Sequence, residues 1–251
     1  MPRYHLIDTL RGFAILNVLV YHFLYDVVHI FSLSLPWFEQ TWSFVWQQVG
    51  ASFFILLAGA MLQVSRRPVQ RGLELVAWGL VATGVTWVLM PAELIVFGIL
   101  QLLGCALLVG TGLRALLVRQ GWHLTKRRAL LGVASCLVGF FVTRNLMWGQ
   151  WGAYNYVLGS VSQEFYTHTW GFVVGLPLED FSSADYYPLL PWGFVFGGGY
   201  FGWTLLPQGH WLTVEEPVLA WLGRRSLVLY LVHQPVILGV LYWLWPYFVS
   251  N

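Results

Sequence analysis

Long apolar runs constrain this chain more than any other feature of its sequence. Seven segments of about twenty residues are each long enough to cross a bilayer as a helix. A chain that is 58% hydrophobic and 10% charged is not an ordinary soluble domain. The predicted spans are 8–30, 42–63, 72–90, 94–117, 128–146, 188–206 and 226–249. We therefore expect an all-α, polytopic membrane helix bundle of about seven transmembrane helices, forming a single domain over residues 1–251.

The basic residues indicate how these helices are oriented. If the N-terminus is cytoplasmic, 12 of the 13 lysines and arginines lie in segments on the cytoplasmic side, and only Arg144 lies outside. The positive-inside rule describes this asymmetry. No cleavage site follows the first apolar region, so we expect this span to remain as an uncleaved anchor. The net charge of +2 does not indicate a nucleic-acid partner.

The first span carries a stripe of ionisable side chains. At about 100° per residue, Asp8, Arg11, His22, Asp26 and His29 fall within an arc of roughly 60° on one face of the helix. Ionisable groups at membrane depth are costly and mark functional sites by default. The alternative is a buried polar network that only holds helices together. His29, at the end of the stripe, is expected to lie in interfacial water.

His22 and Asp26 are the candidate catalytic pair. They are four residues apart on one helical face, so the carboxylate can orient the imidazole and raise its basicity. A general base needs this arrangement. Counted from the outer ends of their helices, Gln101 lies at nearly the same depth as His22. Asp185 is expected to face the same cavity near Asp26.

Polar residues of the inner half extend this predicted route. Asp8 and Arg11 can form a salt bridge that anchors the helix, or they can bind an anionic cosubstrate. His233 lies roughly 10 Å inside the cytoplasmic boundary. With Gln234 it either contacts substrate or satisfies the backbone carbonyl that Pro235 releases.

One long connection, residues 147–187, is expected on the outer side. Segments of this length are usually functional or disordered, and a high aromatic content argues against disorder. We favour an interfacial aromatic belt, with a lid or a sugar-stacking surface as the alternative. Its aromatic residues are Trp148, Trp151, Tyr154, Tyr156, Phe165, Tyr166, Trp170, Tyr186 and Tyr187.

Several motifs, taken in order, resemble one family of membrane enzymes. They are Asp8-Thr-Leu-Arg11-Gly12, Tyr21-His22-Phe-Leu-Tyr25-Asp26, Phe53-Phe54-Ile-Leu-Leu-Ala-Gly59, Phe97-Gly98-Ile-Leu-Gln101, Asp185-Tyr-Tyr-Pro188-Leu-Leu-Pro191-Trp192, and Leu222-Gly-Arg-Arg-Ser226 followed by His233-Gln234-Pro235. Their order and spacing are similar to those of the membrane acetyltransferases typified by heparan-α-glucosaminide N-acetyltransferase, and in particular to its small bacterial members. The resemblance covers most of the chain.

The resemblance implies a transmembrane acyltransferase in the cytoplasmic (inner) membrane of a bacterium. Its cosubstrate would be acetyl-CoA from the cytoplasm, without a metal ion, and its acceptor an amino sugar or glycan on the far side. Catalysis in the family is associated with a histidine between the first two spans, and residues 31–41 contain none. The nearest candidates are His29 and His22, and His22 stands where larger members carry Asn. The residues expected to bind substrate are Asp8, Arg11, His29, Gln101, Asp185, Trp192, His233 and Gln234.

Three functions follow as hypotheses. In the leading one, His22, polarised by Asp26, removes a proton from an acceptor amine or hydroxyl, by direct transfer or through an acyl-histidine. The second is a proton-coupled transporter or exporter that uses the stripe as a relay, although the chain lacks the internal repeat of many transporters. The third is a non-catalytic membrane subunit whose outer segment binds a partner or glycan.

The leading hypothesis also predicts the partners of the chain. They are membrane lipid, acyl-CoA and an amino sugar or glycan acceptor, without nucleic acid, and homodimer formation is left open. The phosphates of coenzyme A are expected near basic residues on the cytoplasmic side, although topology alone also explains these charges. The candidates are Arg66, Arg67 and the cluster Lys126 to Arg128.

Overall fold

The structure is a computed structural model that describes residues 4–207 and 209–249. The α-helices within these residues are α1 (His5–Tyr25), α2 (Thr41–Val64), α3 (Pro68–Leu89), α4 (Ile99–Arg119), α5 (Lys126–Thr143), α6 (Leu189–Leu205), α7 (Pro217–Arg224) and α8 (Ser226–Val249). In the same described residues, six helical segments are long and apolar enough to cross a membrane: His5–Ile30, Thr41–Val64, Pro68–Leu89, Ile99–Arg119, Lys126–Trp148 and Ser226–Pro246. The predicted all-α, polytopic membrane architecture is confirmed.

The sixth predicted span, 188–206, forms α6, which has 17 residues. At 1.5 Å per residue this helix is about 26 Å long, somewhat shorter than the roughly 30 Å hydrocarbon core of a bilayer. Its second residue, Leu190, has an extended backbone (φ −109°, ψ 124°). The apolar pattern therefore located this helix but did not reveal the interruption in its first turn.

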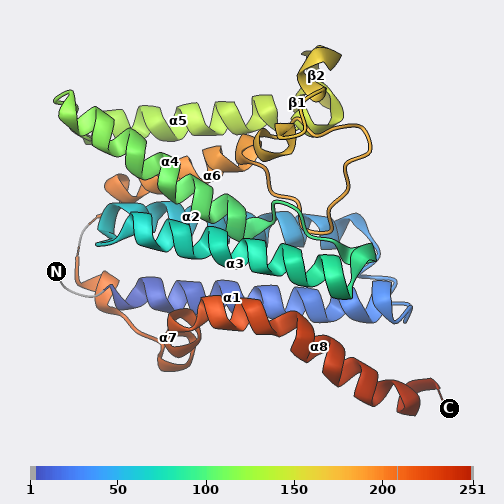
Figure 1. Cartoon of the computed structure of the whole chain (residues 1–251). Helices are drawn as coiled ribbons and strands as arrows, with labels where there is room; N and C mark the ends of the chain where they lie inside the picture. The colour runs from blue at the N-terminus through green and yellow to red at the C-terminus, as the bar shows by residue number, and fades with distance from the viewer. Residues whose placement is uncertain (1–3, 208, 250–251) are drawn as a thin grey trace. The chain divides into compact units, whose positions relative to one another are not determined.

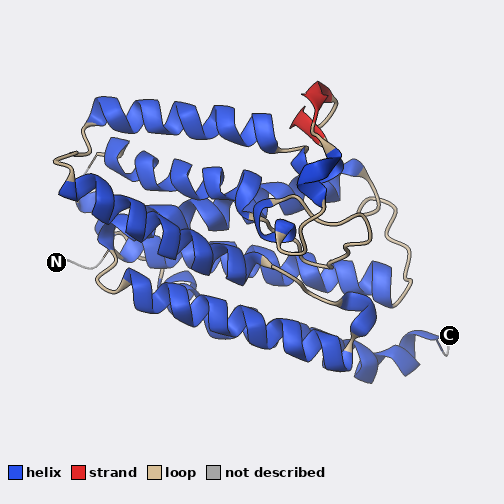
Figure 2. Ribbon diagram, turned by 45° about the horizontal axis from the view of Figure 1, so that its top comes forward, coloured by secondary structure: helices blue, strands red, loops and turns tan. Residues whose placement is uncertain are grey.

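Two elements were not predicted. The eight-residue helix α7 precedes α8, and a small antiparallel hairpin is formed by β1 (Gln150–Ala153) and β2 (Tyr156–Ser160). Figure 2 shows the hairpin near the end of α5. Both elements are much shorter than the apolar runs of about twenty residues from which the spans were predicted.

The chain divides into two compact units. The first unit, residues 1–54 and 208–251, contains α1, the part of α2 up to Phe54, α7 and α8. The second unit, residues 55–207, contains the rest of α2, the helices α3 to α6 and the hairpin. A single domain over residues 1–251 stays a prediction.

In the first unit, α1 and α7 pack so closely that their backbones touch (Figure 1). A Cβ atom at Gly12 of α1 would lie only 1.8 Å from the carbonyl oxygen of Leu219 on α7. A Cβ atom at Gly223 of α7 would lie 1.8 Å from the carbonyl oxygen of Asp8 on α1. Residues without a side chain let two membrane helices approach this closely.

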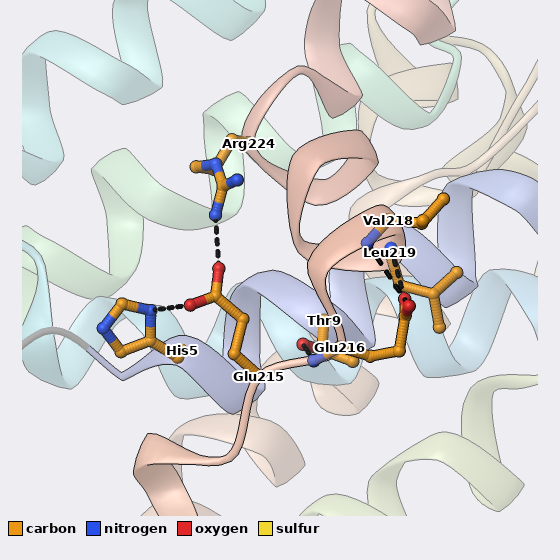
Figure 3. A network of polar contacts seen from close by, with 7 residues as sticks. All are labelled: His5, Thr9, Glu215, Glu216, Val218, Leu219 and Arg224. Carbon is orange, nitrogen blue, oxygen red and sulfur yellow. Dashed lines mark hydrogen bonds and ion pairs between the residues drawn. The ribbon is translucent and has the colours of Figure 1, made fainter.

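A polar network holds the start of α7 against the start of α1 (Figure 3). The Glu216 carboxylate accepts hydrogen bonds of 2.6 and 3.3 Å from two backbone N–H groups of the first turn of α7, which caps the helix. The Glu216 backbone N–H donates to Thr9 Oγ1 at 3.1 Å. The neighbouring Glu215 contacts His5 Nδ1 at 2.8 Å and Arg224 Nη1 at 2.7 Å.

In the second unit, α2 and α6 make a similar glycine contact. A Cβ atom at Gly59 of α2 would lie 1.9 Å from the carbonyl oxygen of Phe196, and one at Gly199 of α6 would lie 2.0 Å from that of Leu56. In both units, therefore, glycine positions determine where helices cross.

Candidate active site

Polar side chains of α1 lie against α8 in the first unit. Arg11 Nη2 donates a 2.9 Å hydrogen bond to the hydroxyl oxygen of Ser226, the first residue of α8. Farther along both helices, the rings of His22 and His233 are in contact, with centroids 4.8 Å apart and planes at 69°. Because the contacts follow in the same order along both helices, α1 and α8 run in the same direction here. This part of the predicted stripe therefore lies against a neighbouring helix.

His233 is buried, with 7% of its surface exposed, and its ring has a defined orientation. Its Nδ1 is hydrogen-bonded to the backbone carbonyl of Tyr230, one turn earlier on α8. A carbonyl only accepts, so Nδ1 carries the hydrogen and the neutral ring presents a lone pair at Nε2. Within residues 4–207 and 209–249, Nε2 is buried and has no hydrogen-bond partner.

Asp26 is completely buried, with 0% exposure, and it connects α1 to α8. Its two carboxylate oxygens accept hydrogen bonds of 2.8 and 2.9 Å from Gln234 Nε2. The amide oxygen of Gln234 is buried and, in the described part of the chain, lacks a hydrogen-bond partner. The Asp26 carboxylate thus orients Gln234. That it also polarises the His22 imidazole stays a prediction.

The structure brings together two histidines that were expected in opposite halves of the membrane. The sequence placed His22 near the outer side and His233 near the inner side by counting residues from assumed membrane boundaries. The predicted start of the last span at residue 226 is confirmed, because α8 is Ser226–Val249, but this start is bonded to Arg11 in the second turn of α1, so the two helices do not begin at the same level. Only the contacts between helices define their relative offset.

A π-helical turn, Asp26–Ile30, follows α1 and changes the direction of His29. The Phe31 N–H donates to the carbonyl of Asp26, five residues earlier, at 2.9 Å, whereas an α-helix would join residues four apart. The step of about 100° per residue therefore does not continue past Asp26. His29 is exposed, and its ring lies 4.4 Å from that of Tyr25. Its role in substrate binding stays a prediction.

Asp8 and Arg11 lie near the start of α1 and are both half-buried. The carbonyl of Asp8 faces Gly223, and the Arg11 side chain reaches Ser226. Sequence reasoning missed Ser226, although the hydroxyl sits directly after two arginines at the start of the last span. The predicted salt bridge between Asp8 and Arg11 stays a prediction.

Gln101 and Asp185 lie in the second unit, where both form hydrogen bonds to backbone or side-chain atoms. The buried Gln101 Nε2 donates to the Gly79 carbonyl at 3.1 Å and to Thr83 Oγ1 at 2.9 Å, which joins α4 to α3. Asp185 Oδ2 accepts a 3.2 Å hydrogen bond from the N–H of Ile99, the first residue of α4. A carboxylate at this position stabilises the start of a helix. The predicted substrate contacts of both residues stay predictions.

Trp192 is one wall of an aromatic box around Arg144 in the second unit. The guanidinium carbon of Arg144 lies 5.5, 5.4 and 5.6 Å from the ring centroids of Trp148, Tyr154 and Trp192, respectively. The Arg144 side chain is buried, so these cation–π contacts are made away from bulk solvent. Sequence reasoning missed this role, and the available signal was that Arg144 is the one basic residue expected outside. A substrate contact of Trp192 stays a prediction.

The long segment 147–187 folds into the hairpin and short helical turns. Buried Asn145 holds the hairpin, because its amide donates to the Tyr154 carbonyl and accepts from the Tyr154 N–H, both at 2.8 Å. The Tyr186 hydroxyl donates to the Phe172 carbonyl at 2.6 Å. Burial, and secondarily the nearby Tyr166, raise the pKa of Tyr186, so this hydroxyl remains a hydrogen-bond donor. The choice between aromatic belt, lid and sugar surface stays open.

Replacing Arg144 is expected to loosen the hairpin. Arg144→Leu removes contacts with three rings, and we expect a loss of about 2 kcal/mol of stability. Unfolding of the purified variant in detergent, with limited proteolysis of residues 147–160, measures the effect. Arg144→Lys retains the charge without the planar guanidinium and should lose less stability than Arg144→Leu. Wild-type resistance of the Leu variant would show that the box does not hold the hairpin.

A surface pocket lies where α2 is connected to α3 in the second unit. Its two exposed guanidinium groups, from Arg66 and Arg67, have the geometry and charge that suit phosphate. The pocket is lined by Arg66, Arg67, Pro68, Val69, Gln70, Leu73 and Glu74.

Comparison with known proteins places this chain in a family. The family model described as "Heparan-alpha-glucosaminide N-acetyltransferase, catalytic" matches residues 3–235. The match covers most of the chain, including α1 and the part of α8 that carries His233 and Gln234. No curated protein and no solved structure shows a significant match.

Proposed function

The chain belongs to the family of heparan-alpha-glucosaminide N-acetyltransferase catalytic domains, and from this premise we propose how it acts as a membrane acyltransferase. The proposed donor is acetyl-CoA or another acyl-CoA from the cytoplasm. The proposed acceptor is an amino sugar or glycan on the extracytoplasmic side of a bacterial inner membrane. The proposed catalytic residues are His22 and Asp26.

The polar cluster between α1 and α8 supports this proposal more than any other observation. Two histidine rings touch with centroids 4.8 Å apart, and the fully buried Asp26 carboxylate lies one helical turn after His22, at the start of the π-helical turn that follows α1. Ionisable groups are expensive within a membrane and mark functional sites by default. The two α8 residues of the cluster, His233 and Gln234, keep buried acceptor atoms without partners in the described residues. Such atoms are unusual in a network that serves only to join helices.

The proposed reaction assigns the proton transfer to His22. The imidazole takes a proton from the acceptor amine or hydroxyl as this group attacks the thioester carbonyl. The new bond from carbon to nitrogen or oxygen forms, the carbon–sulfur bond breaks, and the coenzyme A thiolate leaves. The proton on His22 finally neutralises the thiolate. Asp26 is proposed to favour the charged imidazolium through its negative charge. In the alternative acyl-histidine route, an imidazole nitrogen of His22 attacks the thioester carbonyl and releases the thiolate, and the acceptor then attacks the acyl carbon, so that the bond from this carbon to His22 breaks as the bond to the acceptor forms.

The pocket with Arg66 and Arg67 is the proposed anchor for the phosphates of coenzyme A. The double variant Arg66→Ala, Arg67→Ala loses two guanidinium groups that suit phosphate. We expect its KM for acetyl-CoA to rise about tenfold, with a nearly unchanged kcat, in steady-state assays. Arg119→Ala, at the end of α4, is a control for the general loss of positive charge. Equal KM values for the double variant and the wild type would show that this pocket does not bind the phosphates of coenzyme A.

Acetyl transfer by the purified protein in lipid vesicles tests the proposed function. Acetyl-CoA is supplied on one side of the membrane and glucosamine on the other, and free coenzyme A thiol and acetylated sugar are both measured. The proposal predicts that the two products appear together in equal amounts. Movement of glucosamine or protons without thiol release would instead favour a transporter.

A further inference from the structure

We propose that the outward face of α7 binds an anionic phospholipid, with Arg225 contacting the headgroup phosphate and Trp221 lying where headgroups meet acyl chains. The outward face is the side of α7 that points away from α1. It consists of Val218, Trp221 and Arg225, the residue that ends the helix. Such a site lies apart from the proposed chemistry of His22 and Asp26, and its test needs no acyl transfer.

The level of α7 is set by its contacts with the beginning of α1. The segment His5–Ile30, which contains α1, is long and apolar enough to cross a membrane. The Glu216 N–H, just before α7, donates to Thr9 Oγ1 at 3.1 Å (Figure 3). Gly223, near the end of α7, lies against the carbonyl of Asp8. Between these two contacts a helix running along α1 would advance by about seven residues, so α7 crosses α1 near the beginning of the span. The ends of a span lie close to the boundary between hydrocarbon and headgroups.

The two faces of α7 differ in packing. The face toward α1 consists of Leu219, Ala220 and Gly223. On the outward face, 65% of Val218 and 46% of Trp221 are exposed, and Arg225 is exposed as well. The outward face of a short helix in water is usually polar. A face that combines apolar, aromatic and cationic side chains is typical of helices that lie in the membrane interface.

The charge of the outward face suits an anionic headgroup. The guanidinium carbon of Arg225 lies 4.4 Å from the ring centroid of Trp221, so the cation is held against the indole. The neighbouring Arg224 is paired within the protein, because its Nη1 lies 2.7 Å from a carboxylate oxygen of Glu215. Arg225 is therefore the cation that this face presents to a lipid. A guanidinium group binds phosphate through paired hydrogen bonds, and tryptophan favours the headgroup level of a membrane.

The packed face holds α7 in place independently of the outward side chains. An isolated helix of eight residues would be marginal in water. Here the Leu219 carbonyl lies against Gly12 of α1, and the Glu216 carboxylate caps the first turn. Substitutions at Trp221 and Arg225 therefore change the outward face without removing these contacts.

Lipid binding by the full-length protein in a neutral detergent tests the proposal. Native mass spectrometry measures the affinity for dioleoyl phosphatidylglycerol and, separately, for dioleoyl phosphatidylcholine. Arg225→Gln should weaken phosphatidylglycerol binding about fivefold, the contribution of one basic residue at an anionic surface, and leave phosphatidylcholine binding unchanged. Arg119→Gln, an exposed arginine at the end of α4, is the matched control and should bind phosphatidylglycerol like the wild type. Wild-type affinity in Arg225→Gln, or an equal loss in Arg119→Gln, would overturn the proposal.

Two further measurements distinguish a lipid from a free phosphate and guard against misfolding. Inorganic phosphate and coenzyme A, each in molar excess, should not displace phosphatidylglycerol, and Trp221→Ala should weaken its binding. Displacement by either anion would show that the face binds phosphate groups in general, which contradicts a lipid site. Val218→Lys adds a cation to the same face and should strengthen phosphatidylglycerol binding about fivefold. If Arg225→Gln does not fold, an unchanged affinity in Val218→Lys overturns the proposal in its place.

Discussion

His22→Ala is expected to lower kcat for acetyl transfer by a factor of 10² to 10⁴, the usual contribution of a general base. The cause is the loss of the imidazole that takes the acceptor proton. The binding of acetyl-CoA should remain close to that of the wild type, because its proposed phosphate anchor lies in the second unit. Steady-state kinetics and coenzyme A binding, measured on the same vesicle preparation, check both parts of this prediction.

His210→Ala provides the matched control for His22→Ala. His210 is exposed, belongs to the same unit and plays no part in the proposed chemistry. Its variant should keep the wild-type kcat. A fully active His22→Ala would show that this imidazole is not the base, whereas a poorly folded His22→Ala would be recognised by its elution in gel filtration. Asp26→Asn should lower kcat less than His22→Ala does. The asparagine side chain lacks the negative charge but has nearly the same size and shape as that of aspartate.

The largest expected effect on stability comes from Gly12→Val. A Cβ atom alone would lie 1.8 Å from the carbonyl oxygen of Leu219, which is backbone and cannot turn aside. The valine therefore forces α1 and α7 apart, and we expect a loss of more than about 4 kcal/mol, near the total stability of a marginal domain. The amount of monodisperse protein after extraction and its thermal unfolding midpoint measure this loss.

Gly239→Ala is the control for a glycine that packs against nothing. Gly239 lies in α8 of the same unit, and a Cβ atom there would have no neighbour within 4 Å. Alanine in a helix is more stable than glycine by roughly 0.5–1 kcal/mol, so this variant should unfold at an equal or slightly higher temperature. If Gly12→Val behaved like Gly239→Ala, the close approach of α1 and α7 would be disproved.

The membrane helices could be predicted from the sequence because each depends on its own residues. A run of about twenty apolar residues satisfies its backbone hydrogen bonds internally as a helix wherever it is placed. The ionisable residues on one face of the first span likewise predicted that this face contacts protein and not lipid. The contacts of Arg11 and His22 with α8 agree with this prediction. The ordered outer segment also followed from its own composition, which is rich in aromatic residues.

The pairing of residues across helices could not be predicted in the same way. The contact of His22 with His233 depends on where α8 begins relative to α1, and no local pattern records that offset. The π-helical turn after Tyr25 depends on one extra residue in a turn, which moves His29 without changing the hydrophobic pattern. The partners of Arg144 come from three separate segments, so neither the hairpin nor the box has a signature in any one of them.

The most direct test of the central claim, that acyl transfer occurs between α1 and α8, is photolabelling with an acyl-CoA that carries a photoreactive group at the end of the acyl chain. The wild-type protein in vesicles is irradiated, digested and sequenced by mass spectrometry. We expect label in the peptides that contain His22 or His233, and we expect excess acetyl-CoA to compete with it. Label that competes with acetyl-CoA but lies only in residues 55–207 would contradict it.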